Sequence, residues 1–339
     1  MHHPRIPDAP VPVTIVGGYL GAGKTTLVNH LLEQAGGRRV AVIVNDFGQV
    51  PYARSQPRNA CIEVRLSRGC ICCRATTDFI MALTQVRRRR PRPDHVLVEA
   101  GSACDLTAVA ESARLHGLHV EATVVVADAE AIHAQAVHPR SGRRVLRQLL
   151  AADLVVLNKV ELLSQPERRS VHDWLAGLIP RARVVEVSYG RVPIPLILDR
   201  TPGGTPKEPG RRLAAAEPEL VFWNWSRPQA FDAGAFRWWA ASLPEGVLRG
   251  TGLVHFADDP GRRQRFQLVG SRWSVSRSGP WGAESPNSAL TLIGHAGAFD
   301  PALLDVRIAS CVVEPRAASV PPTGAMSSSS ATLELIPSL

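Results

Sequence analysis

Residues 18–25 read Gly-Tyr-Leu-Gly-Ala-Gly-Lys-Thr, and they closely follow the apolar run Val13–Val16. This is the pattern G-x-x-x-x-G-K-[ST] of a phosphate-binding loop, which requires a buried strand before it and a helix after it. The amphipathic pattern Thr25–Gln34 supplies that helix. Glycines let backbone N–H groups converge on a phosphate chain, and a helix N-terminus favours negative charge. The sequence therefore predicts a nucleoside triphosphate site.

Each residue type in this loop has an expected task. Lys24 is expected to reach the β- and γ-phosphates, and the Thr25 hydroxyl to bind Mg²⁺. The remaining residues predicted to contact the nucleotide here are Gly18, Gly21, Ala22, Gly23 and Thr26.

Outward from the loop, apolar runs alternate with helical patterns up to about residue 188. Runs without polar alternation are typical of strands buried on both faces, and intervening helices imply parallel crossovers. We therefore expect an α/β fold of the P-loop NTPase type, with a doubly wound, mostly parallel sheet. Besides Val13–Val16, the predicted strands are Val40–Val44, His95–Val98, Thr123–Val126, Leu154–Leu157 and Val184–Val187.

The alternation of apolar runs with helical patterns ends at a Pro- and Gly-rich stretch. We expect a flexible arm at 1–10, a nucleotide-binding domain at 11–199, a linker at 200–218, a smaller α+β domain at 219–315 and a disordered tail at 316–339. The elements predicted for the smaller domain are strands Leu220–Trp225, Val247–Phe256, Arg263–Val269, Trp273–Ser276 and Leu290–Ile293, with helices at 232–243 and 300–310.

A base-reading motif follows the predicted strand Leu154–Leu157. Asn158-Lys159-Val160-Glu161 matches the Asn-Lys-x-acid element with which GTPases read guanine. The Glu161 carboxylate is expected to accept hydrogen bonds from the guanine N1–H and amine, while the Lys159 stem covers the base. Adenine lacks these donors and would leave a buried carboxylate unpaired. The usual acid is Asp, so Glu161 is one methylene longer; a coincidental helix start is the alternative.

The strand His95–Val98 ends in Glu99. P-loop folds place at this position the acid that orients the Mg²⁺ hydration shell, and we assign Glu99 that role. The loop after it, residues 100–105, then occupies the position of a γ-phosphate sensor. An exposed acid at a strand end is the alternative.

Three cysteines lie within four positions, at Cys70, Cys72 and Cys73. Such thiols suit Zn²⁺, Co²⁺ or Cu(I), and Asp46 is the nearest carboxylate in chain order to complete the ligand shell. A redox-reactive group or three packed cysteines are the alternatives. The cluster falls between the second strand and the next helix, where GTPases respond to the γ-phosphate. Metal and GTP are therefore expected to tighten each other's binding.

The remaining cysteines and histidines carry weaker signals. Single cysteines in apolar surroundings are interpreted as small core residues; these are Cys61, Cys104 and Cys311. Two histidine pairs have loosely ligand-like spacings, which keeps an accessory metal site as an alternative; these are His116 with His119 and His133 with His138.

The formal net charge of +9 raises the question of a nucleic-acid partner. Arginine supplies nearly all of this charge, which fits a background preference better than a binding face. Arg87–Arg90 and Arg92 end a predicted helix, where cations suit the helix dipole; a site for an anionic partner is the alternative. No stretch approaches the ~18 apolar residues of a membrane span, and residues 1–10 lack a signal-peptide core. We expect a cytoplasmic protein.

The motifs also resemble, in their order, those of a known family. They are the phosphate loop, Asn45-Asp46-Phe47-Gly48, Gly69-Cys70-Ile71-Cys72-Cys73, Glu99 and Asn158-Lys159-Val160-Glu161. This set resembles the CobW family of metallochaperone-type GTPases. The similarity spans about residues 12–313, because Val247-Leu248-Arg249-Gly250 and Leu292-Ile293-Gly294 resemble the family's C-terminal domain.

The resemblance implies a GTP-hydrolysing protein that uses Mg²⁺ and carries Zn²⁺ or Co²⁺ to a client apo-metalloenzyme. Lys24, Thr25 and Glu99 would serve hydrolysis, and the three clustered cysteines would match the family's metal motif. A metal-dependent homodimer is left open. Two motifs depart from the family pattern: Asp46 and Gln49 stand where Glu is usual, and residues 99–106 lack the usual threonines.

Two other functions remain open at this point. A nucleotide-gated scaffold could activate a metalloenzyme without carrying metal, and its client binding would not depend on Cys72. An RNA-associated GTPase is the second alternative, although the arginine bias disfavours nucleic acid; its RNA affinity would fall steeply with salt.

Overall fold

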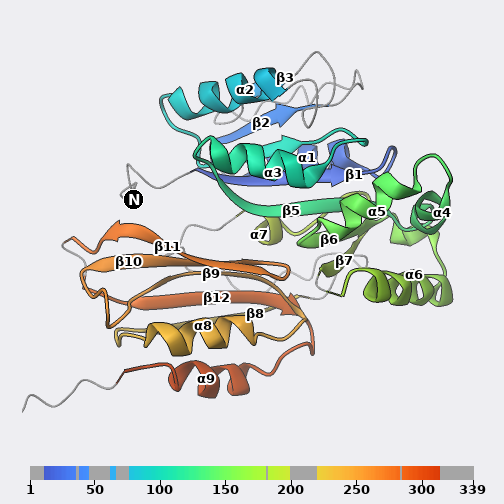
Figure 1. Ribbon diagram of the computed structural model, residues 1–339. Coiled ribbons are helices and arrows are strands. Elements are labelled where there is room, and N and C mark those ends of the chain that lie inside the picture. Colours follow the sequence, from blue (N-terminus) through green and yellow to red (C-terminus); the bar gives the residue numbers. More distant parts are fainter. Residues whose placement is uncertain are drawn as a thin grey trace, which may run out of the picture.

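The computed structural model describes residues 11–35, 38–45, 62–65, 76–180, 182–198, 220–282 and 285–313. These residues form two sheets, which lie one above the other in Figure 1 with helices on their outer faces. In this part of the chain no helix is both long enough and apolar enough to cross a membrane.

The first sheet has seven strands among the described residues, in the order β3-β2-β4-β1-β5-β6-β7, and every pairing is parallel. Strands β2, β4 and β6 are buried along their whole length, as expected for β-branched runs covered on both faces. The strands are β1 (Pro12–Gly18), β2 (Val40–Val44), β3 (Ile62–Arg65), β4 (His95–Glu99), β5 (His119–Asp128), β6 (Leu154–Asn158) and β7 (Arg183–Val187).

Helices cover this sheet on both sides. Phe79, Val109 and Leu175 bring α2, α3 and α6 into the hydrophobic cluster on one face, while Leu27 and Leu196 bring α1 and α7 to the other. The elements between the strands are α1 (Lys24–Glu33), α2 (Thr76–Arg88), α3 (Leu106–Leu115), α4 (Ile132–Val137), α5 (Gly142–Leu150), the short 3₁₀ helix η1 (Val160–Leu162), α6 (Gln165–Leu178) and α7 (Ile194–Ile197).

The second sheet has five antiparallel strands in the described residues, in the order β11-β10-β9-β12-β8. An aromatic core around Trp239, Phe236 and Phe266 joins it to its two helices. Its elements are β8 (Leu220–Arg227), α8 (Ala233–Ala241), β9 (Val247–Val254), β10 (Arg262–Val269), β11 (Arg272–Pro280), β12 (Ser288–His295) and α9 (Pro301–Ala309).

The two sheets share one hydrophobic cluster. Leu248, Val269 and Ile293 of the second sheet pack into the cluster that α1 and α7 form on the first sheet. Figure 1 accordingly shows the second sheet beneath the first, near α7, with α8 and α9 on its far side.

The expected α/β fold with a smaller α+β part is therefore confirmed, and all predicted strands are present. Among the described residues, one strand was not predicted. Ile62–Arg65 forms β3 at the edge of the first sheet, where it pairs with β2. Its four residues include two charged ones, so they carry no apolar run.

Candidate functional site

The phosphate loop lies between β1 and α1, as its motif predicts. Gly18, Gly21 and Gly23 all have positive φ, at 136°, 77° and 101°. Only glycine adopts these conformations without strain. A Cβ on Gly18 would lie 2.3 Å from the Val126 carbonyl oxygen, so the loop also approaches β5 too closely for any side chain.

The N-terminus of α1 is suited to an anion. Its N-cap is Gly23, which offers no capping side chain, and its first turn contains no acidic residue. First-turn N–H groups lack intrahelical acceptors and carry partial positive charge, so phosphate oxygens complement them. Thr26 is exposed in this turn.

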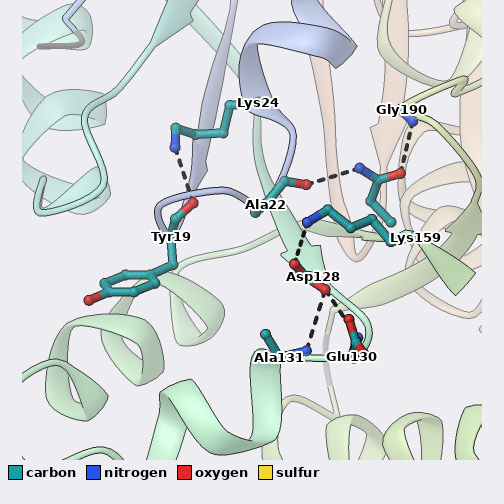
Figure 2. Close-up of polar contacts among 9 residues, drawn as sticks. Tyr19, Ala22, Lys24, Asp128, Glu130, Ala131, Lys159 and Gly190 are labelled. Carbon is teal, nitrogen blue, oxygen red and sulfur yellow. Dashed lines mark hydrogen bonds and ion pairs between the residues drawn. The ribbon is translucent and has the colours of Figure 1, made fainter. Parts of the chain in front are cut away.

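Lys24 and Thr25, at the start of α1, reach different partners. The buried Lys24 donates a hydrogen bond from Nζ to the Tyr19 carbonyl at 3.2 Å, folding back along the loop (Figure 2). The Thr25 hydroxyl donates to Glu99 Oε1 at 2.7 Å. The two residues assigned to Mg²⁺ from the sequence therefore lie in direct contact, and both offer hard oxygen donors.

Asn158, at the end of β6, joins the phosphate loop to a second loop. Its Nδ2 donates to the Ala22 carbonyl at 2.9 Å, and its Oδ1 accepts from the Gly190 N–H at 2.8 Å (Figure 2). The motif thus fixes the loop that follows β7. Tyr189, next to Gly190, has a φ of 55° and is 66% exposed.

Lys159 and Glu161 follow in the turn that leads into η1. Lys159 has a φ of 66° and forms an ion pair with Asp128 Oδ2 at 2.6 Å (Figure 2). Asp128 also accepts from the Glu130 and Ala131 N–H groups, so it is fixed in place. Among the described contacts, Glu161 Oε2 is buried and accepts no hydrogen bond. Donors from a purine edge would fit this atom.

Sequence reasoning missed three parts of this site. Asp128 is the last residue of β5, as Glu99 is of β4. Both acids directly follow an apolar run in the sequence, so the pattern that identified Glu99 also indicates Asp128. Gly190 follows the predicted strand Val184–Val187, where a glycine marks a tight turn. Gln148 of α5 accepts from the Gly18 N–H at 3.0 Å, and only the tertiary structure reveals this contact.

The metal candidates Cys70, Cys72, Cys73 and Asp46 lie outside the described residues, and so does Cys61. Within the described part of the chain, His, Cys, Asp and Glu form no group of three suited to a metal. The two histidine pairs make other contacts there: His116 with the Ser112 carbonyl, His119 with Gln267, His133 with Trp174, and His138 with Ser141. Cys104 and Cys311 are buried, so their interpretation as core residues is confirmed.

The described residue that precedes the cysteine segment in the chain is Arg65, the last residue of β3. In the register of the first sheet, Val44 of β2 pairs with Glu99 on one side and with Arg65 on the other. Neighbouring strands lie ~4.8 Å apart, so the backbone of Arg65 is about 10 Å from that of Glu99. The chain leading to the cysteines thus leaves the sheet from the edge that carries the Thr25–Glu99 pair.

Comparison with protein families agrees with this arrangement. The model of the CobW/HypB/UreG nucleotide-binding domain matches residues 12–186. The chain belongs to the CobW/HypB/UreG family. The model of the cobalamin synthesis protein CobW C-terminal domain matches residues 220–312, which contain the second sheet. The CobW resemblance noted from the motifs is therefore confirmed over both sheets.

Several named proteins are similar to this chain. It is 28% identical to the zinc chaperone CobW of a Sinorhizobium species, over 86% of this chain and 94% of that protein. It is 32% identical to zinc-regulated GTPase metalloprotein activator 1 of Schizosaccharomyces pombe, over 54% of this chain and 47% of that protein. The Zn(II)-bound YjiA GTPase of E. coli is 21% identical, with a TM-score of 0.44 over 89% of this chain and 99% of that structure.

Proposed function

We propose that this protein hydrolyses GTP and carries Zn²⁺, or Co²⁺, to a client metalloenzyme. Cys70, Cys72 and Cys73, completed by Asp46, hold the metal in the segment that responds to the nucleotide. The observation that carries the proposal is the Thr25–Glu99 contact at 2.7 Å, on the sheet edge from which the cysteine segment departs. Zinc as cargo is supported by the names of the Sinorhizobium and fission-yeast relatives.

Hydrolysis of GTP rests on positioning and charge neutralisation. The loop N–H groups and the first turn of α1 hold the phosphates, while Lys24 turns from the Tyr19 carbonyl towards the β- and γ-phosphate oxygens. Thr25 would bind Mg²⁺ through its hydroxyl and Glu99 would orient the ion's hydration shell, and the ion would supply charge neutralisation on the same oxygens. Glu99 is fully buried, which keeps its carboxylate in one place.

Guanine is selected by Glu161. Its buried Oε2 lacks a hydrogen bond among the described contacts, and guanine N1–H and amine groups would satisfy it. Asp128 holds the Lys159 ammonium at 2.6 Å, which leaves the lysine stem to cover the base. Adenine would leave the Glu161 carboxylate unpaired, so GTP is preferred to ATP.

Coupling of nucleotide and metal follows from the sheet edge. Among the described strands, β2 ends beside Glu99 and β3 ends beside β2, one strand further from Glu99, while α2 begins at Thr76, three residues after Cys73. In this proposal, contacts that GTP and Mg²⁺ make near Glu99 act through these neighbouring strands on the segment that carries the thiolates. Thermodynamic linkage requires the metal to strengthen GTP binding by the same factor.

The deciding experiment is a chelator-competition titration of Zn²⁺ and of Co²⁺ with Mg²⁺ and either a non-hydrolysable GTP analogue or GDP. It compares the wild type with Cys72→Ser and with the control Cys311→Ser, whose thiol is buried beside α9 in the second sheet's core. We expect the analogue to tighten metal binding at least tenfold, or about 1.4 kcal/mol, in the wild type and the control but not in Cys72→Ser.

Equal metal affinity in both nucleotide states would contradict delivery gated by GTP. Undiminished metal binding in Cys72→Ser would instead remove the cysteine motif from the metal site. In either case a nucleotide-gated scaffold that activates a metalloenzyme without carrying metal becomes the better description.

A further inference from the structure

Gln148 is a polar residue on the buried face of an otherwise amphipathic helix. In α5 the buried positions are Gly142, Val145, Gln148 and Leu149, which follow helical spacing. Gln148 is 3% exposed, at a position where a leucine would satisfy the pattern. A buried amide is costly unless it is fully hydrogen-bonded, so its presence calls for specific partners.

The Gln148 amide uses both of its ends. Its Oε1 accepts from the Gly18 N–H at 3.0 Å, at the start of the phosphate loop. Its Nε2 donates to the carbonyl oxygens of Ser102 at 3.3 Å and Cys104 at 3.0 Å. Only this orientation of the amide gives all three contacts a donor and an acceptor.

Residues 100–105, which contain both carbonyls, connect Glu99 to the N-cap of α3 at Asp105. The same loop is held on its other side by Asn45: the Asn45 N–H donates to the Glu99 carbonyl at 2.9 Å, and the Cys104 thiol to Asn45 Oδ1 at 3.4 Å. A Cβ on Gly101 would lie 2.9 Å from the Asn45 carbonyl oxygen, so the backbones are in close contact there.

We propose that Gln148 is a positioning residue that fixes the γ-phosphate-sensing loop to the phosphate loop, so that the GTP-binding arrangement exists before GTP arrives. One amide bridges the loop predicted to hold the phosphates and the loop that follows Glu99, the acid assigned to the Mg²⁺ hydration shell. This inference rests on the proposed GTPase function. It assigns to α5 a role in distinguishing GTP from GDP.

The consequence differs between the two nucleotides. GDP engages the phosphate loop but has no γ-phosphate to meet residues 100–105. If those residues were released from Gln148, GTP would have to order them on binding. The apparent GTP affinity would then equal the intrinsic affinity multiplied by the fraction of molecules in which the loop is already correctly placed. GDP affinity would be unaffected, provided that the Gly18 contact is kept.

Gln148→Glu separates the contact to the phosphate loop from the contacts to residues 100–105, because a glutamate side chain has the same shape as glutamine but no N–H donor. One carboxylate oxygen can still accept from the Gly18 N–H, while the other replaces the donor and faces the Ser102 and Cys104 carbonyl oxygens, which it repels. We expect the affinity for a non-hydrolysable GTP analogue to fall at least tenfold, GDP affinity to change less than threefold, and kcat for GTP to fall. The titrations use the full chain with Mg²⁺ and without Zn²⁺.

Two further variants keep the test decisive. Gln148→Met removes the contacts at both ends of the amide. We expect it to weaken the binding of GDP and of the GTP analogue, with the larger loss for the analogue. Gln264→Glu is the matched control: Gln264 of β10 is also buried and donates from Nε2, to Asp259 in the turn between β9 and β10, so its change perturbs folding without reaching the nucleotide. Both nucleotide affinities of this control should match those of the wild type.

Equal losses for GDP and analogue in Gln148→Glu, or no loss for either, would overturn the proposal and leave Gln148 as a structural contact. Thermal unfolding of each variant shows whether it is folded at the assay temperature. Wild type that prefers ATP or fails to hydrolyse GTP would refute the proposed function itself. A negative result for metal delivery alone does not affect the Gln148 test, because these nucleotide titrations contain no Zn²⁺.

Discussion

Gly23 combines a backbone requirement with a packing requirement at one position. Its φ is 101°, and a Cβ there would lie 2.4 Å from Nδ2 of Asn158. Gly23→Ala would therefore push away the amide that joins Ala22 to Gly190. We expect GTP and GDP affinities to fall at least tenfold, with a loss of about 2 kcal/mol in folding free energy. Nucleotide titration and thermal unfolding measure both effects.

Gly21→Ala provides the control for this substitution. Gly21 also has positive φ, at 77°, but no atom of the described residues lies within 4 Å of its Cβ position. The control therefore pays only the backbone strain, about 1 kcal/mol. If Gly23→Ala and Gly21→Ala reduced nucleotide affinity equally, the loss in Gly23→Ala would come from backbone strain and not from a clash with Asn158.

At the level of single residues, the sequence predicted those side chains that belong to contiguous motifs. Lys24, Thr25 and Asn158 lie where their motif spacing places them. Gln148 could not be predicted, because its partners lie 130 and 44 residues away and nothing in α5 points to them. Asp128 could have been found, since it closes an apolar strand as Glu99 does.

The helix α3 begins at an N-cap that is also the last residue of the loop 100–105, which we propose responds to the γ-phosphate. Asp105 accepts from the Thr107 and Ala108 N–H groups at 3.0 and 3.3 Å. Asp105→Ala removes these bonds and should destabilise the first turn by about 1 kcal/mol, which increases amide hydrogen exchange there about fivefold. We also expect weaker binding of the GTP analogue, because the loop loses its fixed end.

Asp300, the N-cap of α9, gives a matched comparison in the second sheet's layer. It accepts from the Ala302 N–H at 2.9 Å. Asp300→Ala should raise hydrogen exchange in α9 by a similar factor and leave nucleotide affinity unchanged. Equal nucleotide affinity in the two variants would show that the α3 cap does not contribute to the site.

At the level of elements, apolar periodicity found the strands that are buried on both faces. It missed β3, because Ile62–Arg65 is a short edge strand in which charged residues alternate with apolar ones. Short, charged strands are a common way to limit pairing at a sheet edge. Such strands resemble loops in composition, and only pairing with β2 identifies this one.

Between the two sheets lies a buried ion pair that no local pattern indicates. Glu121 of β5 and Arg249 of β9 are almost fully buried and bonded to each other, and Gln267 Nε2 donates to Glu121 at 2.6 Å. Arg249→Met removes the arginine charge that balances this buried carboxylate and leaves it only the Gln267 hydrogen bond and His95 at 3.8 Å, so we expect a loss of about 3–5 kcal/mol in folding free energy. The double variant Glu121→Gln/Arg249→Met should recover most of it in denaturant unfolding.

The control for this pair is Arg277→Met. Arg277 is 3.7 Å from Asp259, but its side chain is 71% exposed, and exposed pairs contribute about 0–1 kcal/mol. A loss for Arg249→Met no larger than that of the control would mean that the buried pair is not needed to hold the sheets together.

His119 makes the contact between the sheets sensitive to pH. Burial lowers its pKa, and the Arg265 and Arg114 charges act in the same direction, while Glu121 and the hydrogen bond to Gln267 oppose them. Its pKa is then below the unfolded value of about 6.5, so the unfolded chain binds more protons just below that pH. Stability contributed by neutral His119 is present above pH ~6.5 and decreases as the pH falls towards its folded pKa. We expect the drop in Tm between pH 7.5 and pH 5 to be smaller in His119→Gln than in the wild type, because the glutamine can donate to Gln267 without titrating. Identical drops in the two proteins would show that this histidine does not link protonation to the packing of the two sheets.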